Sequence, residues 1–494
     1  MHPEEHHGDP AGSSARRSIP KIPTNIRGLD DILKGGFPKG RTTILSGTAG
    51  SGKTVLALEF LYRGALEGHA GLFISFEERA GDVRANACAM GMDPTALEDQ
   101  SKLRIIHAEM PVDAVMTGDF DTRGLLALIE GQARLTGAKR IVLDAVDSLM
   151  SIFDNPRRER EEISLLLNRL RDLSMTIIFT VKVEPTGRNV YPFLDFMADC
   201  VLLLDQRVAE QVRTRRLKVL KYRGSDFLSN EHPYALSPDG VMLLPVSAMT
   251  MADASFVERV PSGSEELDRI VGGGYFRGSC ILLCGPSGIG KTSLVCTFAH
   301  AACARGEKVL YVDFEVSPRT LVLAMRSIGL DLQPSLQTDS RLRMLSAMPE
   351  SDGFEEHLVR ILAEITRFSP RHLIVDAISA CRRMGSEKDA FDFLLRLMTA
   401  CRARGITSFF TSQIRNQEHL IQQSGLGISS LVDTIIALEY FLDGQKLNRR
   451  LMVIKSRGSD HSKEFHQFEL SDTGLRLHRN AGQENAARTR EGRV

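Results

Sequence analysis

The sequence predicts an α/β protein with two tandem domains, each holding a mostly parallel sheet flanked by helices. The first observation behind this prediction is an internal repeat: Leu29-Asp30 recurs as Leu267-Asp268, and Gly35-Gly36 recurs at the same spacing as Gly273-Gly274. The second is the alternation of short apolar runs with helical stretches in each half. Strands that are buried on both faces and joined by helices form mostly parallel sheets.

The first half presents the expected elements in order. A strand is expected over 41–46, and a Gly-rich turn then leads into a helix over 55–67. Further apolar strands, each preceded by a helical stretch, are expected over 71–76, 141–144, 176–181 and 201–204. The segments 215–223 and 234–244 are expected to form an antiparallel extension of the sheet.

The repeat also predicts the domain boundaries. Residues 20–246 are expected to form the first domain and residues 256–480 the second, joined by a linker over 247–255. The polar, His-bearing arm over 1–19 lacks the apolar core of a signal peptide. The polar, Arg-rich tail over 481–494 is expected to be disordered, as chain ends often are.

The composition excludes several classes of protein. With 494 residues, of which 43% are hydrophobic and 25% charged, the chain resembles an ordinary globular protein. Lys+Arg and Asp+Glu both number 62, so the net charge is zero and the broad basic field of a nucleic-acid binder is not expected. No uncharged apolar run reaches the roughly 18 residues that a membrane span needs. We therefore expect a cytoplasmic protein without membrane or nucleic-acid partners.

The eight cysteines are scattered through apolar segments, which is typical of reduced, buried thiols. Only Cys280 and Cys284 are close in sequence, and they lie in a run that is expected to be a strand. Four steps along a strand separate them by roughly 13 Å. Because one tetrahedral zinc ion cannot reach both, no metal–thiolate site is expected.

Two Gly-rich segments follow the pattern G-x-x-x-x-G-K-[ST] at corresponding positions of the repeat. Such glycines let backbone N–H groups surround phosphate oxygens, and the following helix N-terminus adds positive potential. Lys53 and Lys291 would reach the β- and γ-phosphates, while the hydroxyls of Thr54 and Thr292 would bind Mg²⁺. A single match could be a mere turn, but two matches favour nucleotide sites. The expected ATP-binding residues are Gly47, Thr48, Ala49, Gly50, Ser51, Gly52, Lys53, Thr54 and Val55, and Gly285, Pro286, Ser287, Gly288, Ile289, Gly290, Lys291, Thr292 and Ser293.

Each half also has an apolar strand that ends in a carboxylate, at Asp144 and at Asp376. An aspartate in this place can hold Mg²⁺ or its water from the C-terminal edge of the sheet. The alternative is a simple helix cap, which the recurrence after both Gly-rich segments disfavours. We therefore expect Asp144 and Asp376 to act with Thr54 and Thr292 as metal ligands.

The strand after the first Gly-rich helix ends in Phe-Glu-Glu, with Glu77 and Glu78 as candidate catalytic acids. Because adjacent strand residues point to opposite faces, only one of the two can face the nucleotide. The repeat favours Glu77, which corresponds to Glu315, whereas Glu78 corresponds to Val316. A carboxylate near the γ-phosphate can orient or deprotonate a nucleophile. The alternative is a solvated loop acid.

These features together resemble the KaiC family of circadian clock ATPases and autokinases. The resemblance rests on the paired Gly-rich halves, on Phe-Glu-Glu, and on two Lys-x-Arg-Gly-Ser segments that begin at Lys221 and Lys455, and it extends from about Ile19 to Leu477. It implies two RecA-like P-loop domains that form a double ring of six subunits, with ATP between neighbours. It also implies ATP hydrolysis in the N-terminal ring and autophosphorylation in the C-terminal ring.

The resemblance assigns roles to matching positions. Glu77 would serve hydrolysis in the first ring with Lys53 and Thr54, and Glu315 would be the general base for phosphoryl transfer in the second ring. The residues implied to approach the ATP of the adjacent subunit are Lys221, Tyr222, Arg223, Arg449, Lys455, Ser456 and Arg457, with Arg215 at the same interface. Without the resemblance, they could belong to a charged edge strand that resists aggregation.

The segment from Gly427 to Ile436 resembles the phosphorylation segment of the family, with Ser429 and Ser430 as the two acceptors. The commoner family pair is Ser-Thr, so Ser430 is a conservative departure that still offers a hydroxyl. The corresponding first-half residues, Asp195 and Phe196, have no hydroxyl, so only the second ring could phosphorylate itself. Taken alone, two serines before an apolar run would be a helix cap.

The resemblance therefore implies a homohexameric ATPase and serine autokinase/autophosphatase that uses ATP and Mg²⁺ and serves as a timer or signalling hub. Two alternatives stay open: a RecA-type recombinase or helicase-like motor on nucleic acid, and a nucleotide-dependent scaffold without kinase activity. A KaiB-like partner on the first ring fits the resemblance. The chain ends soon after Leu477, without the long extension through which family members engage KaiA, so dependence on KaiA is not expected. Val316 is expected to change the balance of phosphorylation and dephosphorylation.

Overall fold

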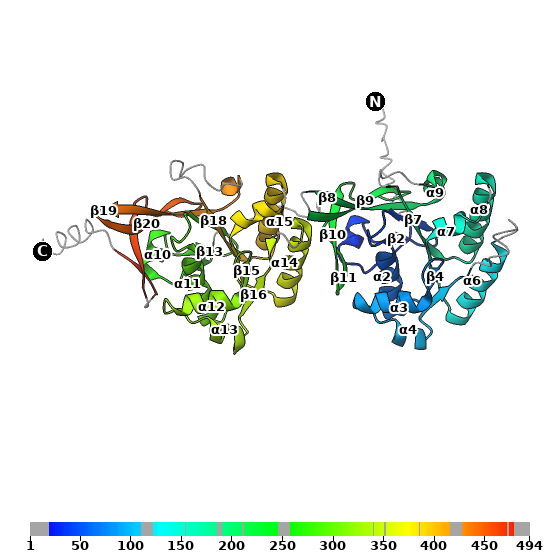
Figure 1. Ribbon diagram of the computed structural model, residues 1–494, viewed down its shortest axis with the longest axis horizontal. Helices are drawn as coiled ribbons and strands as arrows, with labels where there is room; N and C mark the ends of the chain where they lie inside the picture. The colour runs from blue at the N-terminus through cyan, green and yellow to red at the C-terminus, as the bar shows by residue number, and fades with distance from the viewer. Residues whose placement is uncertain are drawn as a thin grey trace, which may run out of the picture. The chain divides into compact units, whose positions relative to one another are not determined.

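The chain divides into two compact units, each built around its own nine-stranded sheet with helices on its flanks (Figure 1). The computed structural model describes residues 19–109, 122–153, 155–184, 190–209, 212–245, 257–338, 340–349, 352–384, 386–414, 427–471 and 474–478. The expected linker and tail, and the expected arm up to residue 18, lie outside these ranges.

The large sheet of the first unit consists of β3 (Thr42–Gly47), β4 (Gly71–Ser75), β5 (Leu103–His107), β6 (Arg140–Asp144), β7 (Thr176–Lys182), β8 (Cys200–Ala209), β9 (Val212–Tyr222), β10 (Glu231–Ser237) and β11 (Gly240–Leu243). Their order across the sheet is β11-β10-β9-β8-β3-β7-β6-β4-β5. The strands from β8 to β5 in this order pair in parallel. Every residue of β3 and β6 is buried, as the apolar runs predict for strands covered on both faces.

The helices of the first unit are α1 (Leu29–Ile32), α2 (Lys53–Leu66), α3 (Ala80–Ala89), α4 (Thr95–Asp99), α6 (Arg123–Thr136), α7 (Val146–Met150), α8 (Pro156–Asp172) and α9 (Pro192–Met197). α2 begins two residues before the expected helix, directly after Gly52, whose positive φ of 86° ends the Gly-rich loop. β8 continues five residues past the expected end at 204, where it lies beside β9. β9, β10 and β11 extend that edge of the sheet.

The large sheet of the second unit consists of β14 (Cys280–Gly285), β15 (Val309–Asp313), β16 (Leu342–Ser346), β17 (His372–Asp376), β18 (Thr407–Gln413), β19 (Thr434–Asp443), β20 (Lys446–Ser456), β21 (His466–Ser471) and β22 (Gly474–Leu477). Its order, β16-β15-β17-β18-β14-β19-β20-β21-β22, matches that of the first sheet strand for strand. The strands from β16 to β19 are parallel, and β19 to β22 pair antiparallel. The predicted duplication and the predicted fold class are confirmed.

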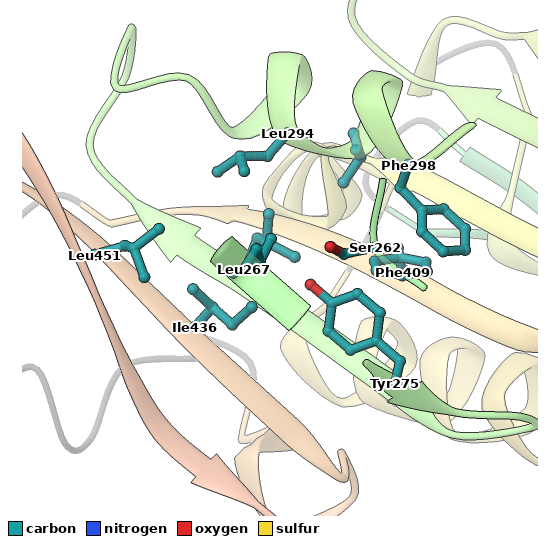
Figure 2. Close-up of a pocket in the computed structure, with 10 residues that line it drawn as sticks. Ser262, Leu267, Tyr275, Leu294, Phe298, Phe409, Ile436 and Leu451 are labelled. Atoms are coloured by element: carbon teal, nitrogen blue, oxygen red, sulfur yellow. The ribbon is translucent and has the colours of Figure 1, made fainter. Parts of the chain in front are cut away.

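The helical elements of the second unit are α10 (Glu265–Ile270), α11 (Lys291–Ala304), α12 (Pro318–Arg326), α13 (Gln333–Gln337), α14 (Phe354–Phe368), η3 (Ile378–Arg383), α15 (Glu387–Ala403) and η5 (Ile428–Ser430). One face of α11 packs into an aromatic core in which Phe298 lies 4.2 Å from Phe409 between ring centroids, and Tyr275 meets Phe409 edge-on at 5.1 Å. Figure 2 shows these rings around a cavity of about 10 Å³, which also touches Leu451 of β20. This small, mostly apolar space belongs to the core.

A tight turn explains why the pair Gly35-Gly36 recurs as Gly273-Gly274. Two short ribbons, β1 (Lys21–Ile22) with β2 (Phe37–Pro38) and β12 (Arg259–Val260) with β13 (Tyr275–Phe276), lie beside this turn in the two units. Gly36 has a φ of 107°, and a Cβ atom there would lie 2.0 Å from the Ile22 carbonyl oxygen. Gly274 meets the Val260 carbonyl in the same way at 2.6 Å. Only glycine fits so close a backbone approach.

All eight cysteines are free thiols, and all except Cys88 are buried. Burial raises the pKa of Cys280 and of Cys284 to about 11, so both thiols stay protonated at neutral pH. The structure thus agrees with the expectation of reduced, buried cysteines. Among the described residues, no helix has the length and apolar character needed to cross a membrane.

Candidate functional site: two phosphate-binding loops

The first Gly-rich loop connects the end of β3 at Gly47 to the start of α2 at Lys53. Gly50 and Gly52 both adopt positive φ, at 74° and 86°, which turns the backbone sharply. Lys53 Nζ donates hydrogen bonds to the carbonyl oxygens of Gly47 at 2.8 Å and Thr48 at 2.9 Å. Its ammonium is thus held against the loop, and burial lowers the pKa of Lys53.

The second loop repeats this geometry between β14 and α11. Gly288 and Gly290 adopt φ values of 72° and 114°. Lys291 Nζ donates to the carbonyl oxygens of Gly285 at 2.9 Å and Pro286 at 2.8 Å, and burial lowers the pKa of Lys291 as well. The backbone N–H groups that begin each helix remain available to an anion such as a phosphate.

The structure brings each expected metal-binding pair together. Thr54 Oγ1 donates to Asp144 Oδ2 at 3.0 Å, and Thr292 Oγ1 donates to Asp376 Oδ2 at 2.8 Å. Asp144 is buried, and this desolvation raises its pKa. A threonine hydroxyl and an aspartate at the phosphate end of the loop are oxygen ligands of the kind that Mg²⁺ takes together with substrate phosphates and waters.

Sequence reasoning missed three further hydroxyl groups at these aspartates. Thr180 on β7 and Thr411 on β18 donate to Asp144 and Asp376, respectively. In the second unit, Tyr311 Oη also donates to Asp376 Oδ2 at 2.8 Å, whereas Phe73 holds the corresponding place on β4. The comparison of the two halves of the sequence could have revealed this difference.

Glu77 and Glu78 lie in the turn after β4, which ends at Ser75. The prediction that both belong to the strand was therefore wrong, although the two side chains do meet different partners. Glu77 Oε1 accepts hydrogen bonds from Ser148 Oγ and Lys182 Nζ, each at 2.5 Å. Glu78 accepts one from Asn86 Nδ2 at 3.0 Å.

Glu315 follows β15 in the corresponding turn of the second unit. Its backbone N–H and that of Val316 donate to Asp313 Oδ1 at 2.8 and 2.7 Å. Burial raises the pKa of Asp313 to about 6. Ser75 holds the place of Asp313 in the first unit, where its hydroxyl oxygen accepts the N–H of Glu78 at 3.0 Å. The second unit thus has a buried acid at the end of β15 and lacks the second glutamate of the first unit.

Basic residues at the ends of β9 and β20 and directly after them hold the expected phosphoacceptor segment and its counterpart in the first unit. Lys455 Nζ donates to the carbonyl oxygens of Ser429 at 3.0 Å and Val432 at 2.7 Å, and Arg457 donates to that of Ser430 at 2.8 Å. In the first unit, Lys221 and Arg223 donate to the carbonyl oxygens that belong to Asp195 and Phe196.

The remaining residues of this group lie on or beside the same strands. Tyr222 is buried, and its hydroxyl donates to the Gly36 carbonyl at 2.8 Å, so its side chain serves the fold. Ser456 lies 3.5 Å from Thr434 Oγ1, and Arg449 on β20 faces Tyr440 across the β19–β20 pair. Arg215 lies on β9. Ser429 is half-buried and Ser430 exposed within η5.

Comparison with known proteins decides the family. The family model for the KaiC ATPase matches residues 22–248 and again residues 260–482. The chain belongs to the KaiC family. It is 36% identical over 470 residues to the circadian clock protein KaiC2 of Synechocystis sp. (strain ATCC 27184 / PCC 6803 / Kazusa), which covers 94% of this chain and 82% of the relative. It is 35% identical over 472 residues to the circadian clock oscillator protein KaiC of Synechococcus elongatus, covering 94% and 90%.

The two KaiC-type repeats confirm the resemblance and the tandem RecA-like architecture, and they identify an ATPase. In the first of these domains, a hollow of about 320 Å³ lies beside the phosphate loop. Most of its lining is apolar, and it is formed by Thr54, Val55, Leu58, Glu78, Val83, Asn86, Ala87, Ala89, Met90 and Met92. Thr54 and Glu78 both line it, so it lies at the end of the site where the phosphates and the candidate catalytic acids are expected. Sequence reasoning did not identify α3 as a wall of the site.

Proposed function

We propose that this chain is a KaiC-like clock or signalling protein that hydrolyses ATP in its first domain and phosphorylates Ser429 and Ser430 in its second. The observation that carries the proposal is the pairing of two equivalent phosphate loops with acceptor hydroxyls in only one unit. Where the second unit has Ser429 and Ser430, the first has Asp195 and Phe196, held by equivalent basic residues.

In both domains the loop would hold the phosphates through backbone N–H groups, with Lys53 or Lys291 moving from the loop carbonyls to the β- and γ-phosphates. The Thr54–Asp144 and Thr292–Asp376 pairs would hold Mg²⁺ directly or through water. When bound, Mg²⁺ neutralises charge on the phosphate oxygens. The chain's own residues would orient the phosphates, so that the nucleophile can attack from one direction only.

In the first domain, Glu77 would orient the attacking water. Desolvation alone would raise its pKa, but the hydrogen bonds from Lys182 and Ser148 outweigh this effect, so the pKa of Glu77 is lowered. A carboxylate of low basicity is better suited to orienting a water than to removing its proton early.

In the second domain, Glu315 would take the proton of the attacking serine hydroxyl as the oxygen–phosphorus bond forms and the bond to the β-phosphate oxygen breaks. We propose that each acceptor reaches the ATP of a neighbouring copy in a homohexamer. Lys455 and Arg457 would couple the acceptor segment to the contact between neighbouring copies, because both residues already donate to carbonyl oxygens of the acceptor segment.

The two activities should be separable by matched substitutions. Glu77→Gln should depress steady-state ATP hydrolysis while leaving much of the phosphorylation at Ser429 and Ser430. Glu315→Gln should nearly abolish phosphoserine formation while ATP still binds, because general-base catalysis contributes about 10²–10⁴-fold. Phosphate release and intact mass, followed over time with Mg-ATP, measure both activities in each variant.

Equal loss of both activities from Glu77→Gln would contradict the division between domains. No added mass in the wild-type protein would favour a nucleotide-dependent scaffold. Strong stimulation of hydrolysis by DNA with a steep salt dependence would instead favour a motor on nucleic acid.

A further inference from the structure

The residue at the end of the strand beside the phosphate loop differs between the two domains. In β7 this residue is Lys182, which pairs with Gly47, the first glycine of its loop. In β18 it is Gln413, which pairs in the same register with Gly285. Both side chains are exposed at the same edge of equivalent sheets. A cation in the first domain is thus replaced by a neutral amide in the second.

Lys182 contacts the candidate catalytic acid directly. Its Nζ lies 2.5 Å from Glu77 Oε1 and 3.6 Å from Asp147 Oδ2. The side chains of Lys182 and Glu77 are 48% and 40% exposed, so solvent reaches the pair and its value lies in geometry more than in Coulomb energy. Ser148 Oγ donates to the same oxygen, so both donors hold Glu77 through Oε1.

The end of β7 is also held in place by the short helix α7. Lys182 N donates to Asp147 Oδ1 at 3.1 Å, so Asp147 of α7 holds the backbone as well as the ammonium. Lys182, Asp147, Ser148 and Glu77 therefore form one connected group. It joins the turn after β4, the end of β7 and the start of α7.

Every supporting member of this group is replaced in the second domain. Counted from Asp144 and Asp376, Asp147 corresponds to Ser379 and Ser148 to Ala380. The backbone contact survives, because Gln413 N donates to Ser379 Oγ at 3.3 Å. The side-chain contacts that Glu77 receives are not repeated at Glu315, and among the described residues no ion pair reaches Glu315.

We propose that Lys182, supported by Asp147 and Ser148, is a positioning residue that holds Glu77 in one orientation for attack by water in the first domain. Gln413, Ser379 and Ala380 provide no such hold, so Glu315 can turn toward a serine hydroxyl and accept its proton. This inference rests on the proposed function, since it assigns the mechanism by which two similar sites favour different nucleophiles.

The group also predicts a pH effect in the first domain. The charged groups that face Glu77 are Lys182 from β7, Lys53 from α2 and Asp147 from α7. Without Lys182 the pKa of Glu77 should rise, because the donor that stabilises its charged form is lost. A smaller fraction of Glu77 would then be ionised in mild acid, and the acidic limb of the rate profile would move to higher pH.

The test uses the full-length chain with Glu315→Gln as background, so that phosphate release reports mainly the first domain. Lys182→Gln copies the residue of the second domain, and Lys182→Arg keeps a donor and a charge. Ser148→Ala removes the other donor to Glu77. Lys139→Gln is the matched control, because Lys139 is an exposed lysine of the same unit whose ammonium donates to the Leu173 carbonyl. Glu77→Gln is the reference for loss of the acid.

Lys182→Gln should lower kcat by on the order of 10-fold with little change in KM for Mg-ATP, because misplaced catalytic groups act on the chemical step. The acidic limb of its rate profile should move to higher pH, and Lys182→Arg should recover most of the rate. Ser148→Ala should lower kcat and move the acidic limb in the same direction as Lys182→Gln does, but by less. Lys139→Gln should match the background in every respect.

The inference fails if Glu77→Gln is impaired while Lys182→Gln and Ser148→Ala keep the background kcat and pH profile. It also fails if Lys182→Gln raises only KM, since Lys182 would then bind the nucleotide rather than position Glu77. If Glu77→Gln itself hydrolyses ATP at the background rate, the proposed function of Glu77 is wrong, which is a different result.

Discussion

At the scale of single residues, the two nucleotide sites differ although their loops are alike. Tyr311 adds a hydroxyl to Asp376 where Phe73 adds none to Asp144. Asp313 places a buried carboxylate beneath the turn of Glu315, where the first domain has a serine. These exchanges make the surroundings of the second aspartate more polar, even though Val316 removes a glutamate. Buried polar groups of this kind are costly unless they are hydrogen-bonded, so they should leave a measurable mark on stability.

Asp313 should make the second unit less stable at neutral pH than in mild acid. Its pKa is about 6 in the folded chain and about 3.9 when unfolded, so between these values the folded protein binds more protons. The free energy of unfolding therefore falls as pH rises through this window. Asp313→Asn, which keeps an oxygen acceptor, should be more stable than wild type at pH 7 by about 1–3 kcal/mol. Denaturant unfolding at pH 7 and pH 4 measures the difference.

The gain from Asp313→Asn should disappear near pH 4, where the native carboxyl is already protonated. Asp331→Asn is the matched control, because Asp331 is an exposed acid in the same unit. A gain of the same size at both pH values would contradict the assigned cause.

At the scale of elements, the recurring glycine pair determines how closely the first turn of each unit can pack. Gly36 combines a positive φ with a close backbone neighbour, the carbonyl of Ile22. Gly68, after α2, has a positive φ of 85°, but a Cβ atom added there would meet no other atom within 4 Å. The two glycines therefore separate the effect of backbone strain from that of a steric clash.

Gly68→Ala should cost about 1–2 kcal/mol of stability, which is the usual penalty for a left-handed alanine. Gly36→Ala should cost about 3 kcal/mol or more, because a Cβ 2.0 Å from an oxygen forces β1 and the turn apart. Thermal unfolding of the two variants under identical conditions measures the difference. If both variants lost a similar amount of stability, the turn at Gly36 would be able to move away from Ile22 at no cost in free energy, which would contradict the prediction.

At the scale of the whole molecule, the duplication places two candidate nucleotide sites on one chain, each with basic residues at or directly after the end of a strand away from its own loop. Lys221 and Arg223 hold the carbonyl oxygens of Asp195 and Phe196, and Lys455 and Arg457 hold those of Ser429 and Ser430; all four basic residues are proposed to meet the ATP of a neighbour. Sites that are completed by a second copy couple nucleotide binding to assembly, because ligand that binds only the assembled form stabilises it.

Saturating Mg-ATP should therefore drive the wild-type chain into a ring, and Lys53→Ala should weaken that ring by removing a phosphate contact. Lys39→Ala changes an exposed lysine of the same unit and should assemble like the wild type. Sedimentation velocity with and without nucleotide measures the outcome. A wild-type monomer at saturating Mg-ATP would contradict the shared-site proposal.

The sequence by itself determined the duplication, the parallel α/β architecture, both phosphate loops and the two strand-end aspartates, because each is encoded in a local pattern of a few residues. Glycines, a lysine and a threonine in fixed order specify a phosphate loop independently of distant residues, and an apolar run specifies a buried strand. The same locality explains why Glu77 and Glu78 were wrongly placed on a strand, since the point at which β4 ends depends on its neighbours in the sheet.

Only the tertiary structure decided which side chains meet at those sites. Lys182 lies 105 positions from Glu77, and Tyr311 lies 65 positions from Asp376, so neither contact has a local signature. Both arise from the strand order, in which only β6 separates β7 from β4, and β15 lies beside β17. Comparison of the two halves could point to Lys182 and Gln413 as different, but only their equal register beside Gly47 and Gly285 gives that difference a chemical meaning.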